Sequence, residues 1–173
     1  MMIHYNITFL DYWHLSSGLS AGAKLDSTVI KDADGLPYVP GKTLKGLVRE
    51  MAELLPDNEA FVSTCFGEEV VQMGACYFTN ATLDDALKEQ IRGNKLQEKL
   101  YDELASTQID KEGMAVDNSL REIEVTIPLT LQGKIDDVPS AYEEKMKQAL
   151  KMIKRMGLNR NRGLGRCIVE VTA

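Results

Sequence analysis

The chain's apolar residues follow strand and helix spacings in the order strand, helix, strand, strand, helix, strand, and this order constrains the fold more than any other feature. The strand-like segments are rich in β-branched and aromatic residues, and they span residues 3–10, 74–83, 121–131 and 167–171. The helix-like segments repeat apolar residues at helical spacing, and they span residues 43–55 and 141–156. An α+β fold with a ferredoxin-like, split βαβ sandwich fits this order.

Prolines, glycines and polar residues indicate where these segments end. We expect Thr43 to be the N-cap of the first helix, Pro56 to stop it, and Gly157 to follow the second helix at its C′ position. Pro128 indicates a sheet edge or a bulge in the third strand. Residues 84–102 are charged and compatible with a helix, so we expect a single domain over residues 1–173 with an insertion at about 84–120.

Length and composition narrow the class of protein. The 173 residues, of which 44% are hydrophobic and 27% charged, suit one soluble domain with a sizeable core. No apolar run approaches the ~20 residues of a membrane helix, and residues 1–10 resemble no secretory signal, so we expect no membrane partner and a cytoplasmic location. Cys65, Cys76 and Cys167 form no CxxC pair, which disfavours a structural zinc site or a disulfide framework.

Charge is unevenly distributed along the chain. The net charge is −6, yet residues 145–166 hold eight Lys and Arg and no acid, so this window carries +8. Residues 84–124 hold 11 acids and 6 bases and therefore carry −5. A concentrated cationic patch can bind phosphates although the whole chain is acidic. The alternative is a solvated helix, rich in Lys and Arg, that ends in a basic loop.

Several common motifs are absent from the sequence. A P-loop that ended in Gly41-Lys42-Thr43 would need a glycine where Leu36 stands. A dinucleotide fingerprint beginning at Gly163 would need a glycine where Ile168 stands. The aromatic consensus of sheet-type RNA readers is missing, and two histidines, His4 and His14, are too few for a histidine-rich metal site.

Two glycine-rich loops carry the residues best suited to bind an anion. The first loop, residues 16–41, contains small residues from Gly18 to Ala23 whose backbone N–H groups can face a phosphate, and it leads into a helix start that carries Lys42 and Lys45. The second loop, residues 157–166, has three glycines and three arginines whose forked donors match phosphate geometry. An ordinary helix cap and an intrachain ion-pair loop are the respective alternatives.

Six segments, taken in order, carry a family resemblance. They are residues 14–18, DSTVIKD at 26–32, LPYVPGKTLKG at 36–46, CFG at 65–67 with residues 74–83, IDKEGMA at 109–115, and the second loop. Together they resemble the RAMP superfamily of CRISPR-associated proteins over nearly the whole chain, and within it the repeated backbone subunit of type III effector complexes. The sequence departs from the family pattern at Thr28, where proline is usual, and at Asn159 and Asn161 beside the arginines.

The resemblance implies a modified RNA-recognition-motif core with a thumb-like insertion, a hairpin around residues 109–124. It implies that several copies of the chain stack along a guide (CRISPR) RNA with other effector subunits, and that they bind a single-stranded target RNA. The residues expected to bind RNA are His14, Ser17, Gly18, Gly41, Lys42, Thr43, Lys45, Arg49, Arg160, Arg162, Gly163, Gly165 and Arg166.

The resemblance also implies a catalytic and metal-binding role for Asp26 in cutting the target RNA. The expected cofactor is a divalent cation, with Mg²⁺ the natural candidate. One carboxylate is a poor Mg²⁺ site alone, so bound RNA would complete it. Lys24 or Lys31 could assist, and Asp32 and Asp34 are competing carboxylates, although Asp34-Gly35 is typical of a turn.

Three functions remain open at this point. The first is a guide-binding subunit that is also a metal-dependent endoribonuclease, active only in the assembled complex. The second is a guide-binding scaffold of the same architecture without chemistry, in which Asp26 only caps a loop. The third is a metal-independent, guide-processing endoribonuclease, for which His14 would be the general acid.

Overall fold

The computed structural model describes residues 1–19, 25–68, 72–117 and 119–172. The small residues 20–23 of the first loop, which we expect near a phosphate, and Lys24 lie outside the described residues. No helix in the described ranges is both long and apolar enough to cross a membrane.

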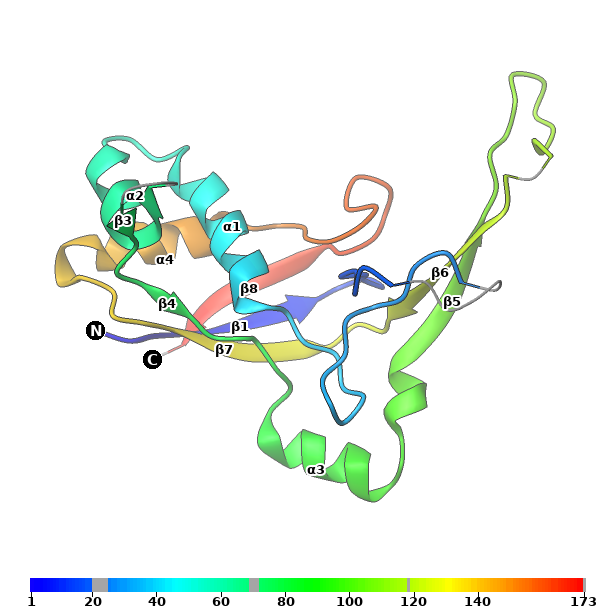
Figure 1. The fold of residues 1–173 in the computed structure, drawn as a ribbon, viewed down its shortest axis with the longest axis horizontal. Coiled ribbons are helices and arrows are strands. Elements are labelled where there is room, and N and C mark those ends of the chain that lie inside the picture. The colour runs from blue at the N-terminus through cyan, green and yellow to red at the C-terminus, as the bar shows by residue number, and fades with distance from the viewer. Residues whose placement is uncertain (20–24, 69–71, 118, 173) are drawn as a thin grey trace.

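The core is a four-stranded antiparallel sheet with the strand order β4-β7-β1-β8 (Figure 1). Its strands are β1 (Ile3–Phe9), β4 (Tyr77–Phe78), β7 (Thr130–Asp136) and β8 (Cys167–Thr172). Strands β1 and β4 are both antiparallel to β7, which lies between them, so they run parallel to each other with a strand inserted. This is the split βαβ topology, and it confirms the ferredoxin-like α+β fold expected from the order of the segments.

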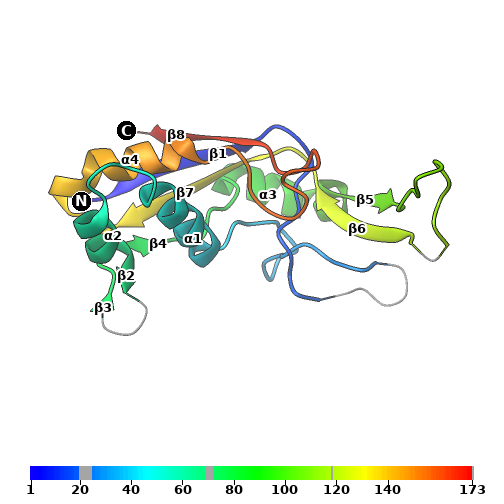
Figure 2. The same ribbon diagram turned by 90° about the horizontal axis from the view of Figure 1, so that it is seen from above.

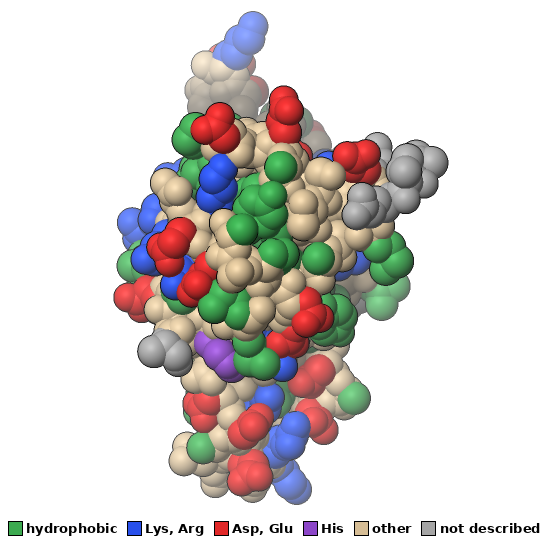
Figure 3. Space-filling view, turned by 90° about the vertical axis from the view of Figure 1, so that its left-hand side faces the viewer, with side chains coloured by type: hydrophobic (Ala, Val, Ile, Leu, Met, Phe, Trp, Pro, Cys, Tyr) green, Lys and Arg blue, Asp and Glu red, His purple; other side chains and the backbone are tan. Residues whose placement is uncertain are grey.

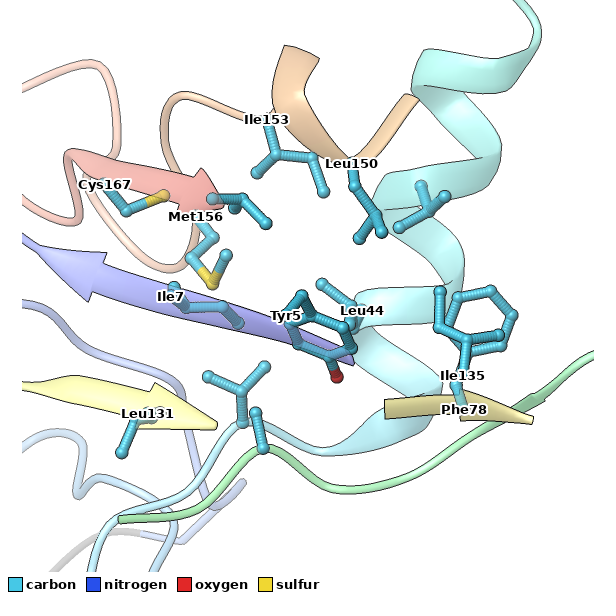
Figure 4. Packing of buried hydrophobic residues seen from close by; sticks show 14 of the residues in the cluster. Tyr5, Ile7, Leu44, Phe78, Leu131, Ile135, Leu150, Ile153, Met156 and Cys167 are labelled. Atoms are coloured by element: carbon cyan, nitrogen blue, oxygen red, sulfur yellow. The ribbon is translucent and has the colours of Figure 1, made fainter. Parts of the chain in front are cut away.

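Two helices, α1 (Gly41–Ala52) and α4 (Glu143–Met152), pack on one face of this sheet (Figure 2). The helices cover this face because it is the apolar one: along β1, Ile3, Tyr5, Ile7 and Phe9 point to it and are buried, while the residues between them are more exposed. Figure 4 shows Leu44 of α1 and Leu150 of α4 beside Tyr5 of β1, in one hydrophobic cluster that also includes Ile7. Burial of the apolar sides of the helices against the apolar face of the sheet positions the loops at the ends of β1 and β8.

The remaining elements decorate this core. They are α2 (Glu59–Phe66), the short pair β2 (Gly67–Glu68) and β3 (Gln72–Met73), α3 (Asp85–Gly93), and the 3₁₀ helices η1 (Gln97–Leu100) and η2 (Ser140–Tyr142). A two-stranded hairpin of β5 (Tyr101–Ser106) and β6 (Arg121–Thr126) projects from the far end of the sheet (Figure 1). The three cysteines are free and buried.

The single strand expected over residues 121–131 is wrong, because the structure divides it into two. Residues up to Thr126 pair with β5 in the hairpin, whereas Thr130 and the residues after it pair with β1. The three residues between them include the exposed Pro128, which has no N–H to donate to a ladder. The proline therefore marks the point where the chain passes from the hairpin to the core sheet.

The expected ends of three other segments also need correction. Helix α1 begins at Gly41 with Pro40 as its N-cap, so Thr43 is not the cap. Helix α4 ends at Met152 because Ile153 is extended, and residues 154–156 bond instead to the chain around β8, so Gly157 is not a C′ residue. Of the strand expected at 74–83, the structure assigns only Tyr77–Phe78 to β4.

Gly41 is needed for the close approach of α1 to β4. A Cβ atom built on Gly41 would lie 2.1 Å from the backbone oxygen of Phe78, a distance that no side chain tolerates. The Gly41 N–H donates to Asn80 Oδ1 at 2.9 Å, so this donor is already satisfied. The glycine expected at an RNA contact therefore has a packing role as well.

We predict that Gly41→Ala lowers the free energy of unfolding by about 2 kcal/mol or more, because backbone atoms cannot move aside for the new methyl group. Gly46→Ala is the matched control, because a Cβ there meets nothing within 4 Å. That variant should gain about 1 kcal/mol from helix propensity. Urea unfolding of both variants measures the difference, and equal stabilities would contradict the packing role.

Candidate functional site

The second loop contacts the segment that joins β1 to the first loop, at the end of the core sheet where β1 ends and β8 begins (Figure 2). The Leu158 N–H donates to the His14 carbonyl at 2.9 Å, and the Gly165 N–H donates to the Tyr12 carbonyl at 2.8 Å. Gly157 permits this contact, because a Cβ there would lie 2.3 Å from the His14 oxygen. Segments separated by more than 140 residues thus form one surface.

Strand β6 of the hairpin holds the first loop in place. Ser27 and Ile123 form an isolated parallel bridge, and the Glu124 N–H donates to the Ser27 carbonyl at 3.1 Å. Asp26 and Glu122 exchange two bonds: the Asp26 N–H donates to the Glu122 carbonyl, and the Glu122 N–H donates to Asp26 Oδ2, both at 2.9 Å. The loop therefore adds to the hairpin as a short third strand.

The side chain of Glu124 binds the part of the first loop that follows Ser27, at Val29 and Lys31. Its Oε2 accepts the Val29 N–H at 3.0 Å, and its Oε1 pairs with Lys31 Nζ at 2.6 Å. Lys31 Nζ also lies 4.0 Å from the centre of the Tyr101 ring, and Tyr101 donates its hydroxyl to the Gly35 carbonyl. Burial and the nearby Glu124 carboxylate raise the pKa of Tyr101 well above its ordinary value, so the hydroxyl stays a donor.

His14 is fully buried, and both of its ring nitrogens have partners. Nδ1 lies 2.5 Å from the Glu124 carbonyl, so it must be the protonated nitrogen, and Nε2 lies 3.1 Å from Ser27 Oγ. A ring with partners on both nitrogens ties the loop to β6. It has no access to a substrate, which disfavours His14 as a general acid.

Asp26 is exposed, and the backbone of Glu122 uses one of its carboxylate oxygens. Among the residues described, the other oxygen has no hydrogen-bond or ion-pair partner, so it can face an external ligand. No group of three or more His, Cys, Asp or Glu side chains suited to a metal occurs within the described ranges. The residues present therefore fit Mg²⁺ only as one carboxylate among ligands that RNA phosphates and water would complete.

The competing carboxylates and Lys31 have structural partners. Asp32 Oδ1 accepts the N–H groups of Asp34 and Leu36, both at 2.9 Å, in a turn that Gly35 completes with φ 76°. Asp34 pairs with Arg92 of α3 at 2.5 Å. Lys31 is held by Glu124. These contacts leave Asp26 as the carboxylate of the first loop best placed to meet RNA.

The N–H groups around Gly18 are less available than expected. Gly18 donates to Ser16 Oγ and Leu19 to Ser17 Oγ, each at 3.1 Å, while Ser17 Oγ lies 2.8 Å from Thr28 Oγ1. Ser17 and Gly18 thus form a closed turn at the surface of the site. These internal hydrogen bonds do not favour the contact with a phosphate that we expected at Ser17 and Gly18.

The basic residues of α1 differ in whether they already have a partner. Lys42 is exposed and Lys45 half-buried, and neither has an ion-pair partner among the residues described. Thr43 donates its N–H to the Pro40 carbonyl. Arg49 is engaged elsewhere, because it pairs with Glu53 at 2.9 Å and donates to the Gly67 carbonyl at 3.3 Å. The two lysines are therefore the cations that α1 offers to a ligand.

The arginines of the second loop also differ from one another. Arg166 makes a two-pronged ion pair with Asp11, at 2.9 and 3.1 Å. Arg160 and Arg162 are exposed and have no ion-pair partner in the described part of the chain. Gly163, with φ 95°, and Gly165, with φ 69°, turn the backbone so that the loop can form. Arg160 and Arg162 are the free forked donors of this surface.

A polar cavity joins the second loop to the hairpin. It has a volume of about 690 Å³ and is lined by Arg162, Arg121 and polar residues of the hairpin such as Ser106 and Ser119. Arg121 precedes Glu122, whose N–H bonds to Asp26, so free cations and the exposed carboxylate occupy neighbouring parts of one surface. The opposite end of the molecule intersperses acids with bases and apolar side chains (Figure 3). This surface can bind an extended polyanion.

Sequence reasoning missed Glu124 and Tyr101 as determinants of the site. Both lie in the segment that we interpreted as an insertion or a sheet strand, and each is far from the loop that it holds: Glu124 is 95 residues from Val29, and Tyr101 is 66 residues from Gly35. The alternation of apolar Ile123 and Val125 in β6 shows which neighbours face away from the core, but no local pattern shows what they contact.

Comparisons with known proteins agree with this architecture. The sequence model of the RAMP superfamily matches residues 6–168, which confirms the resemblance. A cryo-EM structure of type III-B Cmr-beta bound to cognate target RNA contains a chain with a TM-score of 0.78 and 11% identity, covering 99% of this chain and 97% of that one. The apo state of type III-B Cmr-beta has a TM-score of 0.75 at 11% identity and the same coverage. No curated protein sequence matches the chain.

We predict that Glu124→Gln loosens the first loop, because the amide loses the charge that pairs with Lys31 and binds the Val29 N–H. The free energy of unfolding should fall by about 1–2 kcal/mol. Hydrogen exchange at residues 25–31 should accelerate. Glu122→Gln is the control, since Glu122 contributes backbone groups to Asp26. Equal exchange in the two variants would show that the Glu124 carboxylate does not hold the loop.

Proposed function

The chain belongs to the RAMP superfamily, and we propose that it is an RNA-binding subunit of a type III CRISPR effector complex. The similar solved structures are of type III-B Cmr-beta, one of them bound to cognate target RNA, and this supports the assignment. The observation that carries the proposal is the pair of free arginines, Arg160 and Arg162, on the surface that also exposes Asp26.

In this proposal the guide RNA follows the two loops. Lys42 and Lys45 offer point charges, and Arg160 and Arg162 offer forked donors to phosphate oxygens. Contacts of this kind do not distinguish bases, which suits a subunit that must accept any guide sequence. Further copies of the chain and other effector subunits would extend the same track, and the β5–β6 hairpin would reach toward the paired guide and target.

We further propose that Asp26 takes part in metal-dependent cleavage of the bound target RNA. Its free carboxylate oxygen would hold a divalent cation together with RNA phosphates, while its other oxygen keeps the bond to the Glu122 N–H. The cation, when bound, stabilises charge at the scissile phosphate. Because the ligand set is complete only with RNA present, activity is expected only in the assembled complex.

The second candidate is a scaffold that binds guide RNA without chemistry. It is favoured by the same bond between Asp26 Oδ2 and the Glu122 N–H, since a carboxylate that caps the hairpin contact has a sufficient structural reason to be there. A metal-independent ribonuclease built on His14 is disfavoured, because that ring is buried and both nitrogens have partners.

We predict that replacing Arg160 and Arg162 with Gln weakens binding of single-stranded RNA and flattens its salt dependence. Loss of two phosphate contacts should lower the slope of log K against log salt by about 1.4. Arg166→Gln should change this slope less, because Asp11 already neutralises Arg166. Filter binding across a salt series measures all three proteins, and identical slopes would contradict the assignment.

We predict that Asp26→Asn abolishes target cleavage by the assembled complex, with a loss of about 100-fold or more in rate. The amide oxygen can still accept the Glu122 N–H, so target binding should stay within about twofold. Asp34→Asn is the control, because its carboxylate pairs with Arg92. The measurement is cleavage of labelled target RNA with Mg²⁺. A wild-type complex that binds target but never cuts it would establish the scaffold function instead.

A further inference from the structure

A groove that does not include Asp26 lies between the second half of α1, the end of α4 and the second loop. Its volume is about 320 Å³. The residues that line it are Leu47, Glu50, Met51, Met152, Ile153, Lys154, Arg155, Arg160 and Asn161. It is continuous with the surface described above, because Arg160 and Asn161 belong to the second loop.

The floor of the groove is apolar. Leu47 and Met51 of α1 and Met152 of α4 are partly buried and pack against the main hydrophobic cluster, and Ile153 is only 3% exposed. The thioethers of Met51 and Met152 are polarisable and favour contact with a flat aromatic ring. A water-filled groove over such a floor gains free energy when an apolar or aromatic group covers it.

The rim of the groove is cationic. Lys154, Arg155 and Arg160 are exposed, and none of them has an ion-pair partner among the residues that the structure describes. Lys154 and Arg155 are also held in place by their backbones, because the Lys154 carbonyl accepts the Cys167 N–H and Arg155 bridges Arg166. Glu50 is the one acid among the lining residues, and it is exposed at the edge.

We propose that this groove binds a single unstacked RNA base, with the phosphate next to it held by Arg155, Arg160 and Lys154. This inference rests on the proposed RNA-binding function and adds a base-binding site to it. The apolar floor at Met51 and Met152 suits the flat face of an aromatic base, and the cationic rim suits a phosphate. The site would accept a base by its flat face and so would tolerate different bases.

Two observations favour a nucleotide over an acidic protein segment. A volume of about 320 Å³ is at the small end of ligand sites and suits one base with its sugar, whereas a helix would need a longer groove. The rim also continues into Arg160 and thus into the track proposed for the RNA backbone. An acidic peptide remains an outcome that the experiment distinguishes.

The first test changes the charge of the rim without touching the floor. Glu50→Lys should tighten binding of an oligouridine RNA by about threefold at low salt, because it removes an acid and adds a cation beside the phosphate. Glu89→Lys on α3 makes the same change of charge at an exposed position outside the groove. Equal effects of the two variants would show that RNA does not pass this groove.

The second test asks whether a base occupies the floor. Met51→Gln should weaken binding of oligouridine about fivefold, the effect of losing one base contact, and should leave binding of an abasic RNA of the same length unchanged. Oligouridine that contains 5-iodouracil should crosslink to the peptides that carry Met51 or Met152. Urea unfolding confirms that Met51→Gln remains folded, and Met152→Gln is the substitute if it does not.

The outcomes separate this inference from the function on which it rests. If Arg162→Gln weakens RNA binding but the Met51 and Met152 variants bind oligouridine and abasic RNA as the wild type does, RNA binding stands and the base site is overturned. If polyglutamate competes for the groove and abasic RNA does not, an acidic protein segment is the occupant and the proposal is again overturned. If Arg162→Gln has no effect either, the proposed function itself fails.

Discussion

The hydrogen bonds between the first loop and strand β6 are the contact on which the candidate site depends. A long loop must satisfy its backbone donors and acceptors, and here β6 supplies partners through its own backbone and through the Glu124 carboxylate. The buried His14 ring adds a second tie to the same strand. Because β6 also forms half of the projecting hairpin, the position of Asp26 and the direction of the hairpin are mechanically linked. A change that shifts one must shift the other.

Ion pairing decides which cations can act on a ligand. The sequence carries a strongly basic window, yet its members are not equivalent in the structure. Arg166 is neutralised by Asp11, whereas Arg160 and Arg162 have no ion-pair partner within the described ranges. The same distinction separates Lys42 from Arg49, which is bound to Glu53. An acidic protein can therefore present a locally positive surface. The net charge sums all residues, whereas the electrostatic field at one surface depends mainly on the nearby charged side chains that are not neutralised by an ion pair.

Glycines at this surface have a packing role that sequence patterns easily confuse with ligand binding. Gly41 allows α1 to approach the backbone of Phe78, and Gly157 allows the second loop to approach His14. Gly163 differs, because a Cβ there would meet open space and its positive φ alone favours glycine. Glycine-rich loops thus serve two purposes here: they bring the loops together, and they leave their arginines at the surface.

The sequence by itself determined the order of the core elements, the two basic and glycine-rich loops and the family resemblance, because these are local properties of spacing and composition. The family resemblance made Asp26 a candidate, and the local composition of the second loop made its arginines candidates. Only the tertiary structure decided that residues 121–131 divide at Pro128 between hairpin and core, that Glu124 and Tyr101 hold the first loop, and which arginines are free. Those outcomes depend on contacts between residues distant in the sequence, such as Tyr101 and Gly35 at 66 positions, Glu124 and Val29 at 95, and Arg166 and Asp11 at 155. Neither periodicity nor local motifs carry information about such pairs.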